Sequence, residues 1–357
     1  MNCKGGNSMT VYRGYIGTYT KGDSKGIYTF TLDTETAILS EPTLVAQIEN
    51  PTYLSLTTDE KMLYAVAKQD NQGGIASFKI NQAEGQLILQ DMQVSEGVSP
   101  CYVSVDNDNQ HVVAAHYHRG TVEVYPVIED ELKPTSSIVH FQGTGPNVER
   151  QEKPHVHYAN FTPDNKYAIV VDLGTDQIVT FSLHNSQLQK AHSLSVKPGS
   201  GPRHLTFHPN GKYAYVMTEL SNEIIVLAYN PEDGNMMELQ YISTIPADFT
   251  DNSQGSAIHI SSDGRFIYAG NRGHNSIATF AVNEETGLLT FVSYTHTEGD
   301  WPRDFTLDPT EAFLVASNQE SHNLVLFARN SQTGQLTKLA SEVFVPYPVC
   351  LKFLKNK

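Results

Sequence analysis

Arginine, histidine and glutamate stand at the ends of short apolar segments of the chain, in a pattern that suits the binding and conversion of a small anion. Candidates of these residue types include His157, Arg203, Glu219 and Arg272. Arginine offers a planar set of N–H donors that matches a carboxylate or a phosphate. A glutamate beside a histidine supplies an acid and a base near neutral pH. The sequence leaves open which of Glu219 and His157 is the base.

Five further polar residues are candidates for substrate binding: His155, His204, His259, Arg303 and Asn271. The segment PHVH contains two histidines, so the site histidine is either His155 or His157. Each of these side chains has an alternative structural role, because buried polar groups commonly hydrogen-bond to nearby backbone.

The elements that would position these residues are hairpins that recur along the chain. Residues 201–220 read as two strands joined by an Asn-Gly turn. Similar hairpins begin at Asn50, Ser99, Lys153, Gly255 and Asp300, and the single strand YPVCLKF ends the chain. Aligned on Pro51, the later units begin at positions 100, 154, 202, 256, 302 and 348, a period of 46 to 54 residues.

A second repeat lies between these hairpins and gives an independent count. Seven turn segments, from LDTETAILS near Leu32 to NSQTGQLTK near Asn330, each follow another strand. Four strands in each of seven units are typical of a β-propeller. The sequence therefore predicts an all-β fold, a seven-bladed β-propeller with four antiparallel strands per blade.

The two ends of the chain complete the predicted ring. Three strands at the N-terminus and one at the C-terminus make the seventh blade, so the C-terminal strand joins the N-terminal strands and leaves no open edge. We expect residues 1–9 to form a flexible tail and residues 10–357 to form one propeller domain.

Strand direction brings the candidate residues to one face of the disc. In an antiparallel blade, the start of the innermost strand and the end of the next strand lie on the same side. The candidate residues occupy these positions, whereas turns such as Asn210-Gly211 fall on the opposite face. We therefore expect arginines and histidines to line one shared funnel.

Composition narrows the possible partners and the compartment. A net charge of −15 argues against nucleic acid or an anionic membrane as a partner. A local cationic funnel on an acidic body favours a small anionic ligand instead. Three cysteines without CxxC or zinc-ligand spacing indicate free thiols, and no segment resembles a signal peptide or a membrane span. These features predict a cytoplasmic protein, and they leave its oligomeric state open.

Motifs for cofactor chemistry are absent from the sequence. No GxGxxG or P-loop stands between a strand and a helix, and no GxSxG elbow is present. The run HYHR from His116 to Arg119 resembles a metal site, but its spacing alone does not show that the ligands converge. We expect no cofactor and no metal.

Four long segments together resemble the seven-bladed propeller lactonase family. They begin with PHVHYANF, GPRHLTFHPNG, IHISSDGRFIYAGNR and WPRDFTLDP, and the resemblance extends over the chain after its first residues. The family includes bacterial 6-phosphogluconolactonases and, more distantly, fungal carboxy-muconate lactonising enzymes. The resemblance implies hydrolysis of 6-phosphoglucono-δ-lactone in the pentose phosphate pathway, without a cofactor. It also implies a site at His157, Arg203, Glu219 and Arg272, with Arg303 at a further arginine position of the family.

Three other functions remain open. The same residues could act on another sugar lactone or form a lactone from a muconate. The propeller could be a non-catalytic scaffold, although a scaffold does not need these residues in one funnel. A metal-dependent sugar lactonase is the third possibility, which elemental analysis would identify.

Overall fold

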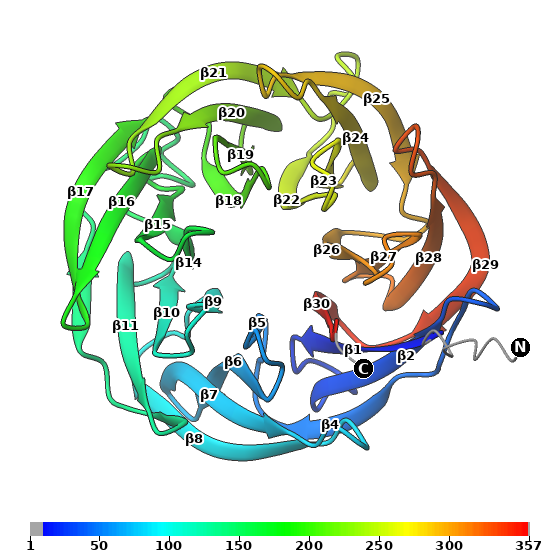
Figure 1. Cartoon of the computed structure of the whole chain (residues 1–357), viewed down its shortest axis with the longest axis horizontal. Helices are drawn as coiled ribbons and strands as arrows, with labels where there is room; N and C mark the ends of the chain where they lie inside the picture. Colours follow the sequence, from blue (N-terminus) through cyan, green and yellow to red (C-terminus); the bar gives the residue numbers. More distant parts are fainter. Residues whose placement is uncertain (1–9, 356–357) are drawn as a thin grey trace, which may run out of the picture.

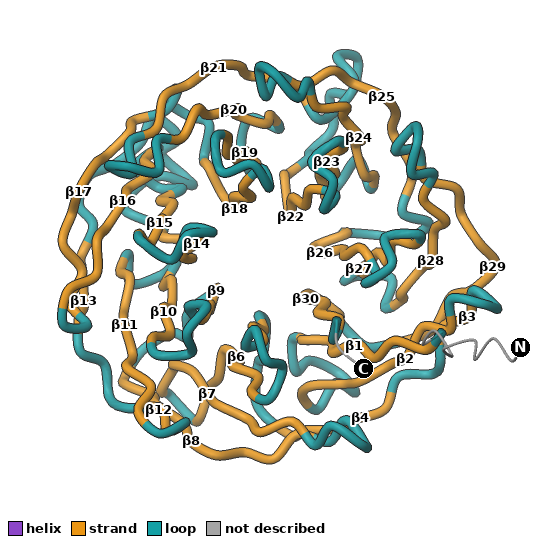
Figure 2. Tube along the Cα trace, in the orientation of Figure 1, coloured by secondary structure: helices purple, strands orange, loops and turns teal. Residues whose placement is uncertain are grey.

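The computed structural model describes residues 10–355 as seven antiparallel sheets arranged in a ring (Figure 1). All regular structure in this part of the chain is β-strand, from β1 to β30. The strands of each sheet succeed one another from the axis of the ring outward, with turns and loops between them (Figure 2). The predicted seven-bladed β-propeller is confirmed. The predicted tail, residues 1–9, lies outside the described residues.

The first three blades follow one another directly along the chain, each with its strands in order from the axis outward. Blade 1 contains β5 (Leu54–Leu56), β6 (Met62–Gln69), β7 (Gln72–Ile80) and β8 (Leu87–Glu96). Blade 2 contains β9 (Tyr102–Val105), β10 (His111–His116) and β11 (Thr121–Ile128), with its outer edge divided into β12 (Glu131–Leu132) and β13 (Ser137–His140). Blade 3 contains β14 (Val156–Phe161), β15 (Tyr167–Asp172), β16 (Gln177–His184) and β17 (Gln187–Ser195).

The remaining blades complete the ring. Blade 4 contains β18 (Pro202–Phe207), β19 (Tyr213–Thr218), β20 (Glu223–Tyr229) and β21 (Met236–Ser243). Blade 5 contains β22 (Gln254–Ile260), β23 (Phe266–Arg272), β24 (Ser276–Val282) and β25 (Leu289–His296). Blade 6 contains β26 (Pro302–Leu307), β27 (Phe313–Asn318), β28 (Asn323–Arg329) and β29 (Leu336–Phe344). Blade 7 contains β30 (Pro348–Phe353), β1 (Val11–Thr18) and β2 (Gly26–Asp33), with an outer edge of β3 (Ile38–Leu39) and β4 (Thr43–Gln47).

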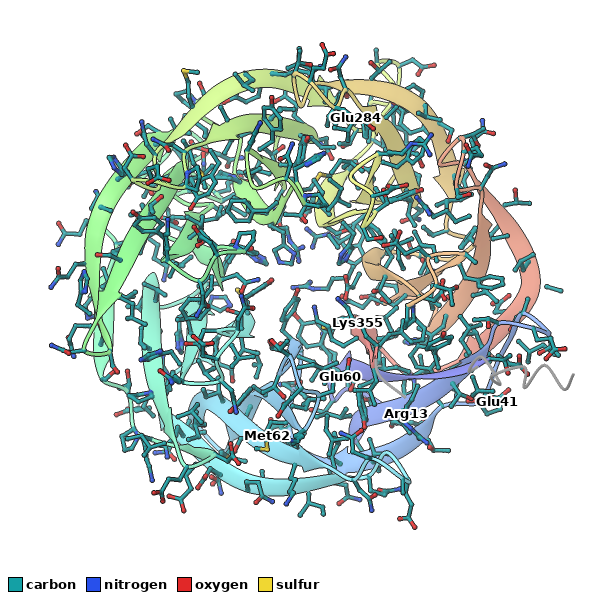
Figure 3. All side chains as sticks on the ribbon, in the orientation of Figure 1. Arg13, Glu41, Glu60, Met62, Glu284 and Lys355 are labelled. Atoms are coloured by element: carbon teal, nitrogen blue, oxygen red, sulfur yellow. The ribbon has the colours of Figure 1, made fainter. Side chains whose placement is uncertain are left out.

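The last strand closes the ring as predicted. β30 pairs antiparallel with β1, with Ile16 opposite Leu351. After β30, the backbone N–H of Lys355 donates to the carboxylate of Glu60, which follows β5 of blade 1; both residues are labelled in Figure 3. The C-terminal strand β30 therefore pairs with β1 inside blade 7, and the residue Lys355 that follows it contacts blade 1.

The second repeat of the sequence has a clear packing role between blades. In three blades, a fully buried tyrosine of the second strand donates its hydroxyl to a glycine carbonyl of the next blade. These pairs are Tyr15 with Gly85, Tyr215 with Gly287, and Tyr268 with Gly334. Each of these glycines ends a turn that begins with asparagine, and its φ is 71° to 73°. Glycine adopts this left-handed conformation without steric cost. The repeated Asn…Gly turns thus fasten each of these blades to the preceding one.

Candidate active site

A cavity of about 680 Å³ lies where the inter-blade loops and the loops after the second strands emerge. Its walls include residues from all seven blades. This volume falls within the range of about 300–1,000 Å³ that is typical of small-molecule sites. The predicted convergence of sequence-distant residues on one face is confirmed for the lining residues His157, Arg203, Glu219, Arg272 and Arg303.

Three of these residues occupy equivalent positions in different blades. The pairing register of the innermost strand shifts by one residue at His157 in β14, at Arg203 in β18 and at Arg303 in β26. Such a β-bulge redirects a side chain and is common beside active sites. The repeated bulge explains why all three side chains reach the same cavity.

Glu219 and Arg272 share a second repeated position. Glu219 directly follows Thr218, which pairs with Pro202 at the start of β18, and Arg272 directly follows Asn271, which pairs with Gly255 near the start of β22. Because these positions are equivalent in the neighbouring blades 4 and 5, the carboxylate and the guanidinium meet side by side.

Two glycines hold the backbone of Glu219 in place. Gly201 has a φ of 58°, and its carbonyl accepts the N–H of Glu219 at 2.7 Å. Gly255 donates its N–H to the carbonyl of Glu219 at 3.2 Å. A Cβ atom on Gly255 would lie 2.1 Å from the carbonyl oxygen of Thr218, so only glycine permits this approach.

The carboxylate of Glu219 is buried among cations. Oε2 accepts hydrogen bonds from Nε of Arg203 at 3.0 Å and from Nη2 of Arg272 at 2.7 Å. Oε1 accepts from Nη2 of Arg150. Nε2 of His157 lies 3.9 Å from Oε2. One carboxylate therefore organises three guanidinium groups and faces the imidazole.

Burial and charge set the protonation states of the central pair. Burial alone would raise the pKa of Glu219, but the positive charges of Arg272 and Arg203 outweigh it and hold this pKa well below its usual value. Burial, reinforced by the charge of Arg203, lowers the pKa of His157 well below its usual value. At neutral pH Glu219 is therefore ionised and His157 is neutral.

Arg303 adds positive charge that no carboxylate neutralises. Within residues 10–355 it forms no ion pair, and its guanidinium carbon lies 5.4 Å from the ring centroid of Tyr19. The adjacent carboxylate of Asp304 accepts the N–H of Leu351 at 2.7 Å and lies 3.6 Å from Nε2 of His259. Lys68 also lines the cavity but is paired with Glu49, so the four guanidinium groups against the carboxylates of Glu219 and Asp304 leave a net charge of +2. Such a site favours an anion.

The family model described as "Lactonase, 7-bladed beta-propeller" matches residues 13–353. The chain belongs to this lactonase family. A Bacillus subtilis (strain 168) protein named 6-phosphogluconolactonase is 57% identical over 348 residues, which are 97% of this chain and 99% of that protein. The resemblance read from the sequence is thus confirmed.

Two solved structures are similar along nearly their whole length. A Lactobacillus plantarum protein has a TM-score of 0.92 and 42% identity, covering 96% of this chain and 99% of its own. The periplasmic gluconolactonase of Pseudomonas aeruginosa has a TM-score of 0.89 and 32% identity, covering 96% of this chain and 99% of its own.

The structure of this family member separates the two histidines of the PHVH segment. The alignment of the third unit on Pro154 is wrong by two residues, because Val156 pairs with Asp172 as Pro202 pairs with Thr218. His157 therefore corresponds to Arg203.

His155 does not line the cavity in the described part of the chain. Its ring stacks on Tyr117 with centroids 4.2 Å apart, and its Nε2 lies 3.0 Å from the carboxylate of Glu152. The expectation that His155 contacts the substrate is not supported by this placement.

The remaining binding candidates divide between the cavity wall and the blade interior. His204 lines the cavity, packed edge-on against Tyr102 with ring centroids 5.1 Å apart. His259 is not among the described lining residues, because it stands further along β22, where its ring contacts Phe305. Asn271 is also absent from the wall; its amide bonds to Thr244 at 2.8 Å, since neighbouring residues of a strand point in opposite directions. His259 and Asn271 therefore lie outside the cavity wall in the described part of the chain.

Sequence reasoning missed Arg150. It lies in the connection 141–155 between β13 and β14, the longest between neighbouring blades. The signal that could have found it is the wide spacing of 54 residues before Pro154, which contains the charged run ERQE. An irregular loop offers no strand alternation from which its direction could be predicted.

The two histidines of the HYHR segment lie in different surroundings. His116 is buried beside Glu123, whereas His118 lines the cavity. Across residues 10–355, no group of three or more His, Cys, Asp or Glu side chains is arranged to hold a metal ion. In the same residues, no helix is long and apolar enough to cross a membrane.

The Glu219→Gln variant is expected to lose about 3–5 kcal/mol of unfolding free energy at pH 7, because the buried arginines lose their counter-charge. The folded-state pKa of Glu219 is depressed, so its ionised form stabilises the protein fully above the unfolded value of 4.5. This stabilisation is lost progressively as the pH falls below 4.5 and through the lower folded-state pKa of Glu219. Urea unfolding of both proteins should therefore give a difference that narrows below about pH 4.5. A difference that stays constant on acidification would contradict the assignment.

Proposed function

We propose that the protein hydrolyses 6-phosphoglucono-δ-lactone to 6-phosphogluconate, as a carboxylic ester hydrolase of the pentose phosphate pathway. The observation that carries this proposal is the net charge of +2 in the cavity. A phosphate monoester brings a charge of about −1.5 to −2 at pH 7, which would balance it. The name of the 57% identical relative supports the same substrate.

His157 is the general base in this proposal, and Glu219 is its charge partner. Neutral His157 can accept a proton from water at Nε2, and the carboxylate 3.9 Å away then stabilises the imidazolium. Both carboxylate oxygens of Glu219 already accept hydrogen bonds from arginines, which leaves the imidazole as the freer proton acceptor. This contact geometry supports the proposed division of the two roles, which the sequence leaves open.

The reaction then proceeds in two steps. The oxygen of a water molecule attacks the lactone carbonyl carbon while His157 takes one of the water protons. N–H groups of Arg203 and Arg272 stabilise the oxyanion that forms. The bond between this carbon and the ring oxygen breaks, and the imidazolium returns its proton to the ring oxygen, which becomes a hydroxyl. The resulting carboxylic acid ionises, and no cofactor is consumed.

Other candidate residues would contribute to substrate binding. Arg303 and His204 line the cavity and would contact the sugar or its negative charges. The expected partner is thus a small anionic sugar lactone. We also propose a cytoplasmic location, which is consistent with the free thiols of Cys101 and Cys350 in the described residues.

A second candidate function is hydrolysis of an unphosphorylated sugar lactone. It is favoured by the similarity to the gluconolactonase of Pseudomonas aeruginosa, which covers 96% of this chain. In this case the positive charge of the cavity would bind hydroxyl and carbonyl oxygens only.

The test compares lactones under one set of conditions. Purified protein is given freshly generated 6-phosphoglucono-δ-lactone, glucono-δ-lactone or a carboxy-muconate, and product formation is corrected for the spontaneous reaction. We expect acceleration with the phosphorylated lactone and a lower kcat/KM with the unphosphorylated one. Faster reaction of glucono-δ-lactone or the muconate would replace the proposed substrate. No acceleration with any of them would favour a scaffold.

A further inference from the structure

The connection 141–155 holds Arg150 over the cavity in a defined position. Backbone N–H groups of Arg150 and Gln151 donate to Asn147, to its side-chain oxygen at 3.1 Å and its carbonyl oxygen at 2.7 Å respectively. The buried side chain of Gln151 donates to the carbonyl of Leu173 at 2.9 Å. The loop is therefore fastened to blade 3 at the residue next to Arg150.

The guanidinium of Arg150 differs from those of Arg203 and Arg272 in exposure. Its side chain is 32% exposed, whereas theirs are 3% and 4% exposed. It bonds to Oε1 of Glu219, while the two buried arginines share Oε2. This bond uses Nη2, and a further hydrogen bond joins Arg150 to the hydroxyl of Tyr117, so the other N–H donors among its five stay available.

The partial exposure of the Arg150 side chain and its remaining N–H donors suit a strongly hydrated anion. The buried arginines lie beside His157, where the reacting carbonyl must be placed. A phosphate group on the far end of the sugar is costly to desolvate, so the half-exposed wall is the better place for it. An arginine there can hold two phosphate oxygens with parallel N–H donors.

We infer that Arg150 binds the phosphate group of the substrate and sets the preference for a phosphorylated lactone over its unphosphorylated form. Glu219 orients the guanidinium of Arg150, and the remaining donors of Arg150 hold the phosphate. This inference rests on the proposed function.

The test measures selectivity for the phosphate. Arg150→Gln and Arg150→Lys are compared with wild type on 6-phosphoglucono-δ-lactone and glucono-δ-lactone. We expect Arg150→Gln to lower kcat/KM for the phosphorylated lactone by about 10- to 100-fold and to change the other by less than about 3-fold. Arg150→Lys should recover part of the loss, because a point charge replaces a bidentate donor.

Lys68→Gln is the matched control. Lys68 also lines the cavity, but its ammonium pairs with Glu49 and does not contact Glu219. This variant removes the same charge and should leave the selectivity unchanged. A similar loss of selectivity in Lys68→Gln would show that overall charge, and not Arg150, recognises the phosphate.

A second readout does not depend on turnover. Binding of 6-phosphogluconate and of gluconate is measured by calorimetry with wild type and Arg150→Gln. We expect the variant to weaken only the phosphorylated product. If Arg150→Gln lowers kcat/KM equally for both lactones and weakens the binding of both products equally, the inference is overturned. Arg150 would then only support Glu219. Wild type that hydrolyses neither lactone would instead refute the proposed function.

Discussion

The His157→Gln variant is expected to hydrolyse the lactone with a kcat about 10²- to 10⁴-fold below that of wild type, the usual loss on removal of a general base. KM should change little, since Arg203, Arg272 and Arg303 still line the cavity. The amide of glutamine can contact water but cannot accept its proton. Steady-state kinetics under one buffer condition measure this difference.

His155→Gln is the matched control for this prediction. His155 is two residues away, but its ring bonds to Glu152 instead of lining the cavity. Its kcat should stay within a few-fold of wild type. Equal losses in the two variants would contradict the assignment of the base to His157.

The pH profile provides a further check on the same residue. Burial, together with the charge of Arg203, lowers the pKa of His157, so the neutral base persists below its ordinary value of 6.5. The kcat/KM of wild type should therefore not begin to fall until the pH is well below 6.5.

The Arg203→Ala variant is expected to lower kcat by about 10²- to 10³-fold, the range seen when one oxyanion donor is removed. Arg203 bonds to Glu219 through Nε, and its Nη1 lies 3.4 Å from Nδ1 of His204, which leaves Nη2 to face the substrate carbonyl. Removal of the side chain takes away both this donor and part of the positive charge that keeps Glu219 ionised.

Arg203→Lys distinguishes geometry from charge. Lysine keeps the positive charge but cannot pair with Glu219 and point a second donor at the carbonyl at once. Its kcat should remain close to that of Arg203→Ala, with a melting temperature nearer to wild type. Full recovery of kcat by lysine would mean that charge alone is needed at this position.

The overall fold could be predicted because it repeats. Each hairpin occurs once per blade or nearly so, the Asn…Gly turn occurs in four of the blades, and every copy predicts the same local structure. The division of the seventh blade between the two ends follows from the strand count, and the pairing of β30 with β1 confirms it.

The candidate site could be predicted to the correct face, but only in part to the individual side chains that line the cavity. Strand direction places Asn271, Arg272, His155 and His157 at the cavity end of their blades. Which of them face the cavity depends on the bulge at His157 and on the alternation between Asn271 and Arg272. A bulge adds one residue without a sequence signature strong enough to fix its place. Arg150 was missed because a long loop has no such periodicity.

The most direct measurement compares wild type with the double variant His157→Gln/Arg203→Ala on the same preparation of 6-phosphoglucono-δ-lactone. Formation of 6-phosphogluconate is followed through its dehydrogenase and corrected for spontaneous ring opening. We predict clear acceleration by wild type and only the spontaneous rate with the double variant, provided that both proteins unfold cooperatively. A double variant as active as wild type would show that the reaction, if it occurs, does not take place in this cavity.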